Sequence, residues 1–256
     1  MDFSLNLPPN WHHTHVARTD STMTLIRNVS IPNDDLQRVE LITADYQEAG
    51  HGQRGTTWEA DEAKNLLFSF AFRPKNVRAD RQFLLSEALA LAVCDALKPL
   101  VGDCKVKWPN DIYWKDRKIC GMLLEHTLCG PFIDSTRTGV GINVNQKDFK
   151  GDAPNPVSIR QITGSDASCG HLMEKVAERF LYYYNLLLRG QSEVLHNIYM
   201  EHLYRKTGFH PYRDSSGQTF EATIADIAPT GLLTLQTRSG EKRTFAFKEI
   251  SFCLRK

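Results

Sequence analysis

Two adjacent apolar segments between residues 65 and 97 constrain the fold more than any other feature of the sequence. Residues 65–72 form an almost continuous apolar run, which is typical of a strand in the interior of a sheet. Residues 79–97 carry apolar side chains at helical spacing over a wide face, namely Leu84, Leu85, Ala88, Leu89, Leu91, Ala92 and Ala96. We therefore expect a central strand and a largely buried helix.

The flanking segments predict further strands and helices. Strands are predicted at residues 39–46, 104–108, 111–114, 119–126 and 131–140. The chain before them is predicted to be an irregular lead-in that ends near His15 and Val16. Ser21 and Thr22 supply N-cap chemistry for a helix, and residues 168–189 predict a long amphipathic helix that stops at Gly190.

The sequence pattern changes near residue 207. Short alternating runs at residues 220–225, 232–236 and 243–247 are separated by turn residues around Gly231 and Gly240. This pattern is typical of a small all-β unit. We expect an α+β catalytic domain over residues 1–205 and a small β domain over residues 206–256.

Composition and charge argue against several classes of protein. With 256 residues, 41% of them hydrophobic, the chain is neither disordered nor collagen-like. A net charge of +1 gives no general support for nucleic-acid binding, although a local basic patch stays open. The apolar runs are shorter than the ~20 residues of a membrane helix. Six cysteines without a CxxC pair, and an N-terminus unlike a signal peptide, predict a cytoplasmic protein.

A glycine-rich segment follows the predicted strand at residues 39–46. Gly50, Gly52 and Gly55 allow backbone amides to approach an anion. The segment is no dinucleotide fingerprint, because no helix of a βαβ unit follows it, and it lacks the lysine of a Walker loop. A ligand-binding loop and an ordinary surface loop remain equally open from these residues alone.

A second segment reads Lys107-Trp108-Pro109-Asn110-Asp111 at the end of an apolar strand. Lys107 alternates with Val106 and Trp108, so we expect its side chain to point into the domain, where an ammonium needs an anionic partner. Asn110 and Asp111 offer an amide and a carboxylate for hydroxyl groups, or for Mg²⁺ with phosphates.

A third segment combines basic residues with glycines in strands. Lys118 precedes Gly121, and Gly139-Val140-Gly141-Ile142-Asn143 ends a later apolar strand. A strand glycine indicates close approach of a ligand or of another backbone, and a β-bulge explains the glycines equally well.

Taken in order, these segments resemble the biotin–protein ligase family. The resemblance is carried by Asp20-Ser21-Thr22, Gln47-x-x-Gly50-x-Gly52-x-x-Gly55-x-x-Trp58, Lys107-Trp108-Pro109-Asn110-Asp111, Lys118-x-x-Gly121 and Gly139-x-Gly141-Ile142-Asn143. The Lys-Trp-Pro-Asn-Asp element is its most specific part. The resemblance spans nearly the whole chain and implies a class II synthetase-like catalytic domain with a mixed sheet, followed by an SH3-like β-barrel.

The resemblance also implies an activity. Such enzymes form biotinyl-5′-AMP from biotin and MgATP, and then transfer biotin to a lysine of a biotin carboxyl carrier domain. We therefore expect biotin, ATP with Mg²⁺ and a carrier domain as partners, without nucleic acid or membrane. The oligomeric state is left open between a monomer and a homodimer.

Roles for individual residues follow from the same resemblance. Lys107 would contact the biotin carboxylate and the α-phosphate, as the catalytic residue. The biotin side would comprise Ser21, Thr22, Met23, Gln47, His51, Gly52, Gln53 and Lys107. The nucleotide and Mg²⁺ side would comprise Arg54, Trp58, Asn110, Asp111, Lys118, Gly121 and Asn143. No protein-bound metal is expected, because His12, His13 and His15 lack accompanying ligands at a metal-binding spacing.

Three rival functions need separate consideration. A lipoate or octanoate ligase or transferase shares the general fold, and a transferase would need a cysteine nucleophile, for which Cys120 is the candidate. A non-catalytic biotinyl-AMP sensor would bind nucleotide without releasing pyrophosphate. Some family members are repressors with an N-terminal winged helix, but only some 15 residues precede the first motif here, so no DNA-binding function is expected.

Two departures from the family pattern predict weaker retention of the intermediate. His51 and Gln53 stand where many members have arginines, and Met23 stands where an asparagine is common. Because each missing charge-assisted contact removes about 1 kcal/mol, free biotinyl-AMP should escape roughly fivefold faster per contact than from an arginine-rich relative. The release rate of labelled intermediate measures this, and release that is no faster would contradict it. His51→Arg, compared across pH, tests whether His51 adds positive charge as the pH falls.

Overall fold

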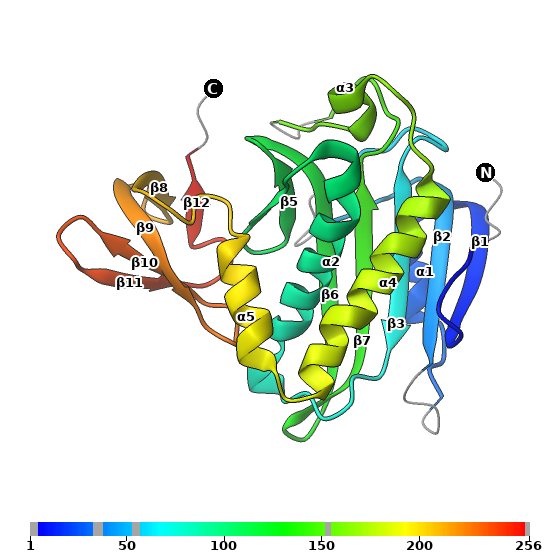
Figure 1. Ribbon diagram of the computed structural model, residues 1–256, viewed down its shortest axis with the longest axis horizontal. Coiled ribbons are helices and arrows are strands. Elements are labelled where there is room, and N and C mark those ends of the chain that lie inside the picture. Colours follow the sequence, from blue (N-terminus) through cyan, green and yellow to red (C-terminus); the bar gives the residue numbers. More distant parts are fainter. Residues whose placement is uncertain (1–4, 33–37, 53–56, 152–154, 254–256) are drawn as a thin grey trace.

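The larger part of the molecule is a mixed sheet of seven strands in the order β1-β2-β3-β7-β6-β5-β4. The computed structural model describes residues 5–32, 38–52, 57–151 and 155–253 (Figure 1). The strands of this sheet are β1 Trp11–Thr19, β2 Val39–Gln47, β3 Leu66–Phe72, β4 Lys105–Lys107, β5 Asp111–Trp114, β6 Arg117–Cys129 and β7 Phe132–Ile142. β1 and β2 are parallel, whereas the other neighbours pair antiparallel.

Helices cover the two faces of this sheet unequally. The long helices α2 Phe83–Val101 and α4 Cys169–Leu188 pack against one another over one face (Figure 1). The short helix α1 Thr22–Arg27 covers part of the other face, where Met23 and Ile26 form a separate small core with Ile42. The rest of that second face carries the glycines of β6 and β7 beside apolar residues such as Leu67 and Leu123.

The central strand and the buried helix are confirmed. Every residue of β3 is buried, and β3 lies third in the sheet. Phe70 and Phe72 pack edge-on against Phe180 of α4, Phe72 also against Tyr184, and Phe68 stacks on Phe70. The buried helix begins at Phe83, because residues 79–81 form a separate 3₁₀ turn.

The prediction of an irregular lead-in that ends near His15 and Val16 was wrong, because residues 11–19 form the edge strand β1. The sequence of this strand is polar, so it has no apolar alternation. Two of its histidines contact the neighbouring strand, with His13 Nε2 and His15 Nδ1 2.8 and 3.0 Å from Thr43 Oγ1. The helices α3 Ile159–Thr163 and α5 Ser192–Glu201 were also missed. No described helix combines the length and the apolarity that a membrane crossing requires.

A second, antiparallel sheet follows, with five strands in the order β11-β10-β9-β8-β12. The strands are β8 His210–Asp214, β9 Thr219–Ile227, β10 Leu233–Thr237, β11 Lys242–Phe245 and β12 Ile250–Phe252, and only β9, β10 and β11 were predicted. This C-terminal sheet shares the main hydrophobic core with the first sheet. His196 of α5 also joins the two parts, with Nδ1 2.9 Å from Glu87 Oε1 and Nε2 3.6 Å from Asp226 Oδ1.

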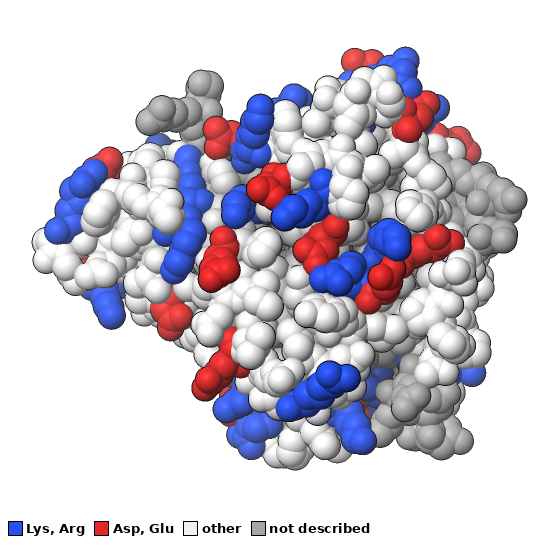
Figure 2. All heavy atoms as spheres, in the orientation of Figure 1, with Lys and Arg blue, Asp and Glu red and all other residues white. Residues whose placement is uncertain are grey.

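Charges of both signs are interspersed over the face shown in Figure 2, in keeping with the near-zero net charge. Lys and Arg side chains lie beside Asp or Glu on most of this face. Among the ion pairs of the described residues, Arg179 of α4 pairs with Asp95 of α2.

His126 of β6 makes the stability of the fold sensitive to acid. Its Nδ1 lies 3.0 Å from Thr136 Oγ1, and burial lowers the pKa of the ring from 6.5 to about 4. Below pH 6.5 the unfolded chain therefore takes up a proton that the folded chain does not, and stability falls. Between pH 7 and 4.5 this loss is about 2–3 kcal/mol.

We predict that His126→Gln reduces this acid-induced loss, because the replacement carries no titrating ring. Urea denaturation of both proteins at pH 7 and 4.5 measures the difference. His171→Gln, at an exposed position on α4, is the control and should leave the loss unchanged. Equal losses in wild type and His126→Gln would refute the assignment.

Candidate functional site

A chain of buried hydroxyl and amide groups lies where α1 meets the sheet. Gln47 Oε1 accepts hydrogen bonds from the Thr22 amide at 2.7 Å and from Thr22 Oγ1 at 2.9 Å. Ser69 Oγ donates to Thr22 Oγ1 at 2.8 Å, and Ser21 Oγ caps α1 by accepting from the Met23 amide at 3.2 Å. The structure thus brings together four of the residues predicted on the biotin side, and it adds Ser69, which sequence reasoning missed.

Three glycines make the neighbouring floor of the sheet flat. Gly139 pairs with Ser69, and Gly141 pairs with Gly121, so all of these positions face the same side. A Cβ at Gly139 would overlap the Met23 side chain, and one at Gly141 would overlap the Trp58 indole. A Cβ at Gly121 would lie 2.9 Å from Trp58 Cζ3. The glycines therefore let Met23 and Trp58 lie directly on the sheet.

The glycine-rich loop is closed at its base. The Trp58 amide donates to the Gly50 carbonyl at 2.9 Å, and His51 bridges to Thr57. His51 Nδ1 lies 3.2 Å from the carbonyl of Ala49, and Gly52 is half-buried. Gln53 and Arg54, predicted as site residues, lie outside the described residues.

The Gln47–Thr22–Ser69 chain and the three glycines form one strip across this face of the sheet. Charged groups occupy the end of the strip that lies away from Thr22. Asp111 pairs in register with both Gly121 and Lys107, so its carboxylate stands on the glycine face. Lys118 Nζ lies 2.7 Å from Asp111 Oδ1, and Lys107 Nζ lies 3.9 Å from Asp111 Oδ2. From Ser69 to Asp111 the strip crosses three strand spacings, or roughly 14 Å. It could hold an elongated ligand with a polar head at one end and an anionic group at the other.

Lys107 lies on the glycine face of the sheet, opposite the core-facing Val106, and is largely buried there. Its side chain is 18% exposed, and burial lowers its pKa, with Asp111 opposing the shift and Lys118 and Arg205 adding to it. The site thus holds two ammonium groups close to one shared carboxylate. An additional anion would be attracted to these cations in a partly water-excluded setting.

The two asparagines predicted on the nucleotide side also bond to the backbone. Asn110 bonds to the carbonyl of Met122, while its own carbonyl accepts from the Met122 amide at 2.9 Å. Asn143 donates Nδ2 to the Val157 carbonyl at 3.2 Å, and its Oδ1 is buried without a partner in the described part of the chain. Both side chains therefore hold strand ends in place, and Asn143 retains one acceptor.

A positioning network next to Trp58 was missed by sequence reasoning. Glu59 Oε1 accepts from the Lys150 amide at 2.8 Å, and its Oε2 accepts from the Gly151 amide at 2.6 Å. Buried Gln146 accepts from the Asp61 amide at 3.0 Å. These bonds connect the segment after the glycine loop to the segment after β7. No local sequence signal indicates them, because the partners lie about 90 residues apart.

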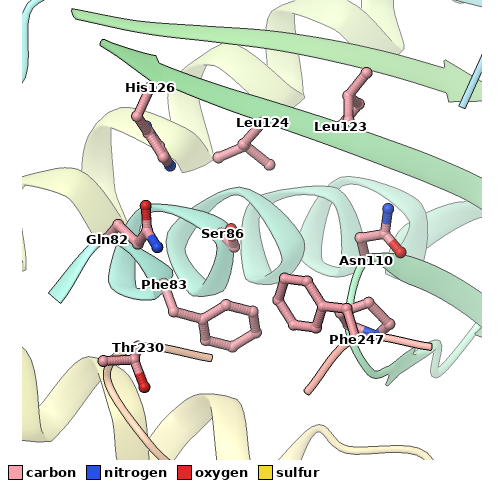
Figure 3. Close-up of a pocket in the computed structure, with 10 residues that line it drawn as sticks. Gln82, Phe83, Ser86, Asn110, Leu123, Leu124, His126, Thr230 and Phe247 are labelled. Atoms are coloured by element: carbon pink, nitrogen blue, oxygen red, sulfur yellow. The ribbon is translucent and has the colours of Figure 1, made fainter. Parts of the chain in front are cut away.

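A cavity of about 170 Å³ lies beside this strip, at the junction with the C-terminal sheet (Figure 3). In Figure 3 Gln82, at the N-cap of α2, and Ser86 of α2 lie opposite Leu124 and His126 of β6, whereas the Phe83 ring points towards Phe247. Thr230 and Phe247, from connections of the C-terminal sheet, close it, and among the described residues that line it Asn110 is the one predicted for the site. The cavity is therefore adjacent to the predicted site and distinct from most of it.

Cys120 does not face the strip. Its side chain is fully buried, and burial raises the pKa of its thiol. A buried thiol with a raised pKa is a poor nucleophile, which argues against a cysteine-based transferase.

Comparisons with known proteins place this site in a family context. A model of the biotin/lipoate A/B protein ligase family matches residues 15–145. The biotin–[acetyl-CoA-carboxylase] ligase of Paracoccus denitrificans is 31% identical over 172 residues, covering 64% of this chain and 70% of that relative. The corresponding ligase of Mycobacterium tuberculosis is 34% identical over 148 residues, covering 56% of this chain and 53% of that relative, so the match spans about half its length.

A solved structure shows the same fold. The biotin protein ligase of Aquifex aeolicus, in complex with biotin and ATP, superposes with a TM-score of 0.75 at 22% identity. The superposition covers 93% of this chain and 97% of that one. The predicted fold, a mixed sheet with helices followed by a separate antiparallel sheet, is confirmed.

The packing of Trp58 on glycine yields a prediction. Gly141→Ala should destabilise the protein by about 1–3 kcal/mol, because the new methyl group displaces the indole. In a Trp58→Leu background the same substitution should cost less than about 1 kcal/mol, giving a measurable coupling in a double-mutant cycle. Urea denaturation of the four proteins measures it, and equal costs in both backgrounds would show that the indole does not rest on Gly141.

Proposed function

The chain belongs to the biotin/lipoate A/B protein ligase family, and we propose that it is a biotin–protein ligase that adenylates biotin and transfers it to a carrier-domain lysine. The observation that carries this proposal is the continuous strip from the Gln47–Thr22–Ser69 chain, over the glycines, to Lys107 and Lys118. Relatives named biotin–[acetyl-CoA-carboxylase] ligases and the biotin- and ATP-bound Aquifex structure support the choice of substrates.

The polar end of the strip suits the head group of biotin. A ureido group has one carbonyl acceptor and two N–H donors, and the hydroxyls of Ser21 and Thr22 can donate or accept. Gln47 fixes Thr22 through two hydrogen bonds, so the polar groups are ordered in advance. Met23 on Gly139 provides an apolar wall beside them.

The charged end suits the first chemical step. A carboxylate oxygen of biotin attacks the α-phosphorus of MgATP, the new P–O bond forms, and pyrophosphate leaves with the broken α–β bridge. Two anions must approach each other in this step, so fixed positive charge lowers the barrier. Lys107 and Lys118 supply that charge, with Asp111 paired closely to Lys118 and more distantly to Lys107.

Trp58 suits the nucleotide side. Its ring lies on Gly121 and Gly141, and Lys118 Nζ lies 5.5 Å from the ring centroid. The indole N–H is buried and has no acceptor within the described residues, so it can donate to a bound molecule. In the second step the acceptor lysine attacks the carbonyl carbon of the adenylate and AMP leaves, which requires no protein nucleophile.

The proposal also covers the domain boundaries, the acceptor and the location of the protein. We place the catalytic domain at residues 1–205 and the β domain at residues 206–256, since the second sheet begins at His210. The biotin carboxyl carrier domain as acceptor, the cytoplasmic location and the absence of DNA binding stay predictions.

We predict that Lys107→Ala lowers biotin-dependent ATP–pyrophosphate exchange by two or more orders of magnitude, because it removes charge that stabilises the transition state. Lys105→Ala is the matched control, since Lys105 is exposed on the same strand. Thermal melting should show that both variants fold. Exchange at the wild-type rate in Lys107→Ala would remove Lys107 from its assigned role.

Substrate identity has its own test. The protein incubated with biotin, MgATP and a carrier domain should give a streptavidin-reactive band, and excess lipoate should not compete. Competition by lipoate would favour the lipoate ligase alternative. Nucleotide binding without pyrophosphate exchange would favour a biotinyl-AMP sensor.

A further inference from the structure

The Lys107 ammonium lies between two aromatic rings that come from different sheets. Its Nζ is 5.3 Å from the ring centroid of Tyr113 on β5 and 5.1 Å from that of Phe252 on β12. Both distances are within the ~6 Å at which an ammonium is attracted to the face of an aromatic ring. The C-terminal sheet thus reaches the amine on which the proposed adenylation depends.

Phe252 is held firmly in this position. It packs edge-on against Tyr212 of β8 with ring centroids 4.9 Å apart, and Tyr212 is fully buried. Beyond it, the Cys253 amide donates to the Pro211 carbonyl at 3.1 Å, and Arg205 Nη2 donates to the Cys253 carbonyl at 3.0 Å. The ring is therefore anchored by its own sheet.

The backbone around Lys107 is also fixed from the C-terminal side. The Val106 amide donates to the His202 carbonyl, and the Tyr204 amide donates to the Val106 carbonyl, both at 2.8 Å. Trp108 Nε1 donates to the Gly231 carbonyl at 3.0 Å, and its ring lies edge-on to Phe247. The positions of the main chain around Lys107 and of its ammonium group are thus both determined by contacts with residues beyond 201.

An aromatic ring solves a particular electrostatic problem at Lys107. The nearest carboxylate, Asp111, is closer to Lys118 at 2.7 Å than to Lys107 at 3.9 Å, so it holds Lys107 only weakly. A second carboxylate would hold the ammonium more tightly but would repel an anionic substrate. A ring face attracts the ammonium without adding a net negative charge.

We propose that Phe252 is a positioning residue for the reaction, through which the C-terminal sheet holds the Lys107 ammonium where the reacting anions meet. The inference rests on the proposed function, because it assigns the effect to adenylation. It differs from simple packing in requiring an aromatic ring at residue 252 rather than only a side chain of similar volume.

Three variants separate these alternatives. Phe252→Leu keeps an apolar side chain but removes the ring face, and Phe252→Tyr keeps the ring. Phe220→Leu is the matched control, because Phe220 also packs near Tyr212 on the C-terminal sheet but contacts Phe245 and Arg243 instead of Lys107. Thermal melting records how far each variant is destabilised.

The kinetic readout is biotin-dependent ATP–pyrophosphate exchange. We expect Phe252→Leu to lower kcat about three- to tenfold, with the KM for biotin changed less than about twofold. The reason is that the ring of Phe252 positions the Lys107 ammonium, which stabilises the transition state. Phe252→Tyr should restore kcat to near wild type, and Phe220→Leu should leave it unchanged. Wild-type kcat in Phe252→Leu, or an equal loss in Phe220→Leu, would overturn the proposal.

A spectroscopic readout needs no activity. Protons on the ε-carbon of Lys107, assigned by their loss in Lys107→Arg, should resonate upfield in the wild-type protein because ring faces shield them. Phe252→Leu should move them downfield, and Phe220→Leu should not. Unshifted protons in the wild type would refute the contact itself. Absence of biotin-dependent exchange in the wild type, with the shielded signal present, would instead refute the proposed function.

Discussion

The site depends on the ion pairs that the carboxylate of Asp111 forms with two lysines. This carboxylate stands between Lys118 and Lys107, two ammonium groups that would otherwise repel each other in a partly buried setting. One carboxylate against two lysines leaves an excess of positive charge, which is what a reaction between two anions requires. The glycine floor and the Gln47–Thr22 bonds matter because they align a long ligand with this charged end.

Much of the site was predictable because its residues lie in short, ordered segments. The segment around Lys107 indicated a buried lysine, and its side chain is 18% exposed. The glycines of β6 and β7 indicated close approach of a ligand or of another backbone, whereas the groups that lie on them are the side chains of Trp58 and Met23. Ser69 and Glu59 were not predictable, since a buried serine or a loop glutamate gains meaning only from partners distant in sequence. Phe252 was missed for the same reason.

The fold was predictable wherever a segment buries one consistent face. β3 and α2 are strongly apolar, α4 carries one apolar face, and burial of apolar area dominates folding. β1 was missed because its side chains are polar and its place is set by parallel pairing to β2, which no local pattern reveals. β12 was missed because it has three residues and pairs with β8 rather than with the preceding strand, and β8 was missed because its sequence, His210–Asp214, is polar and contains a proline.

Trp108 illustrates how a residue in a chemically important segment can serve another purpose. Its indole donates to the Gly231 carbonyl, and Gly231 has a φ of +95° and no room for a side chain beside Phe83. The segment around Trp108 and the turn around Gly231, more than 120 residues apart in sequence, therefore keep a fixed position relative to each other. Any residue other than glycine at position 231 would strain the backbone and meet Phe83 and Phe247, and it would thereby shift the carbonyl to which Trp108 donates.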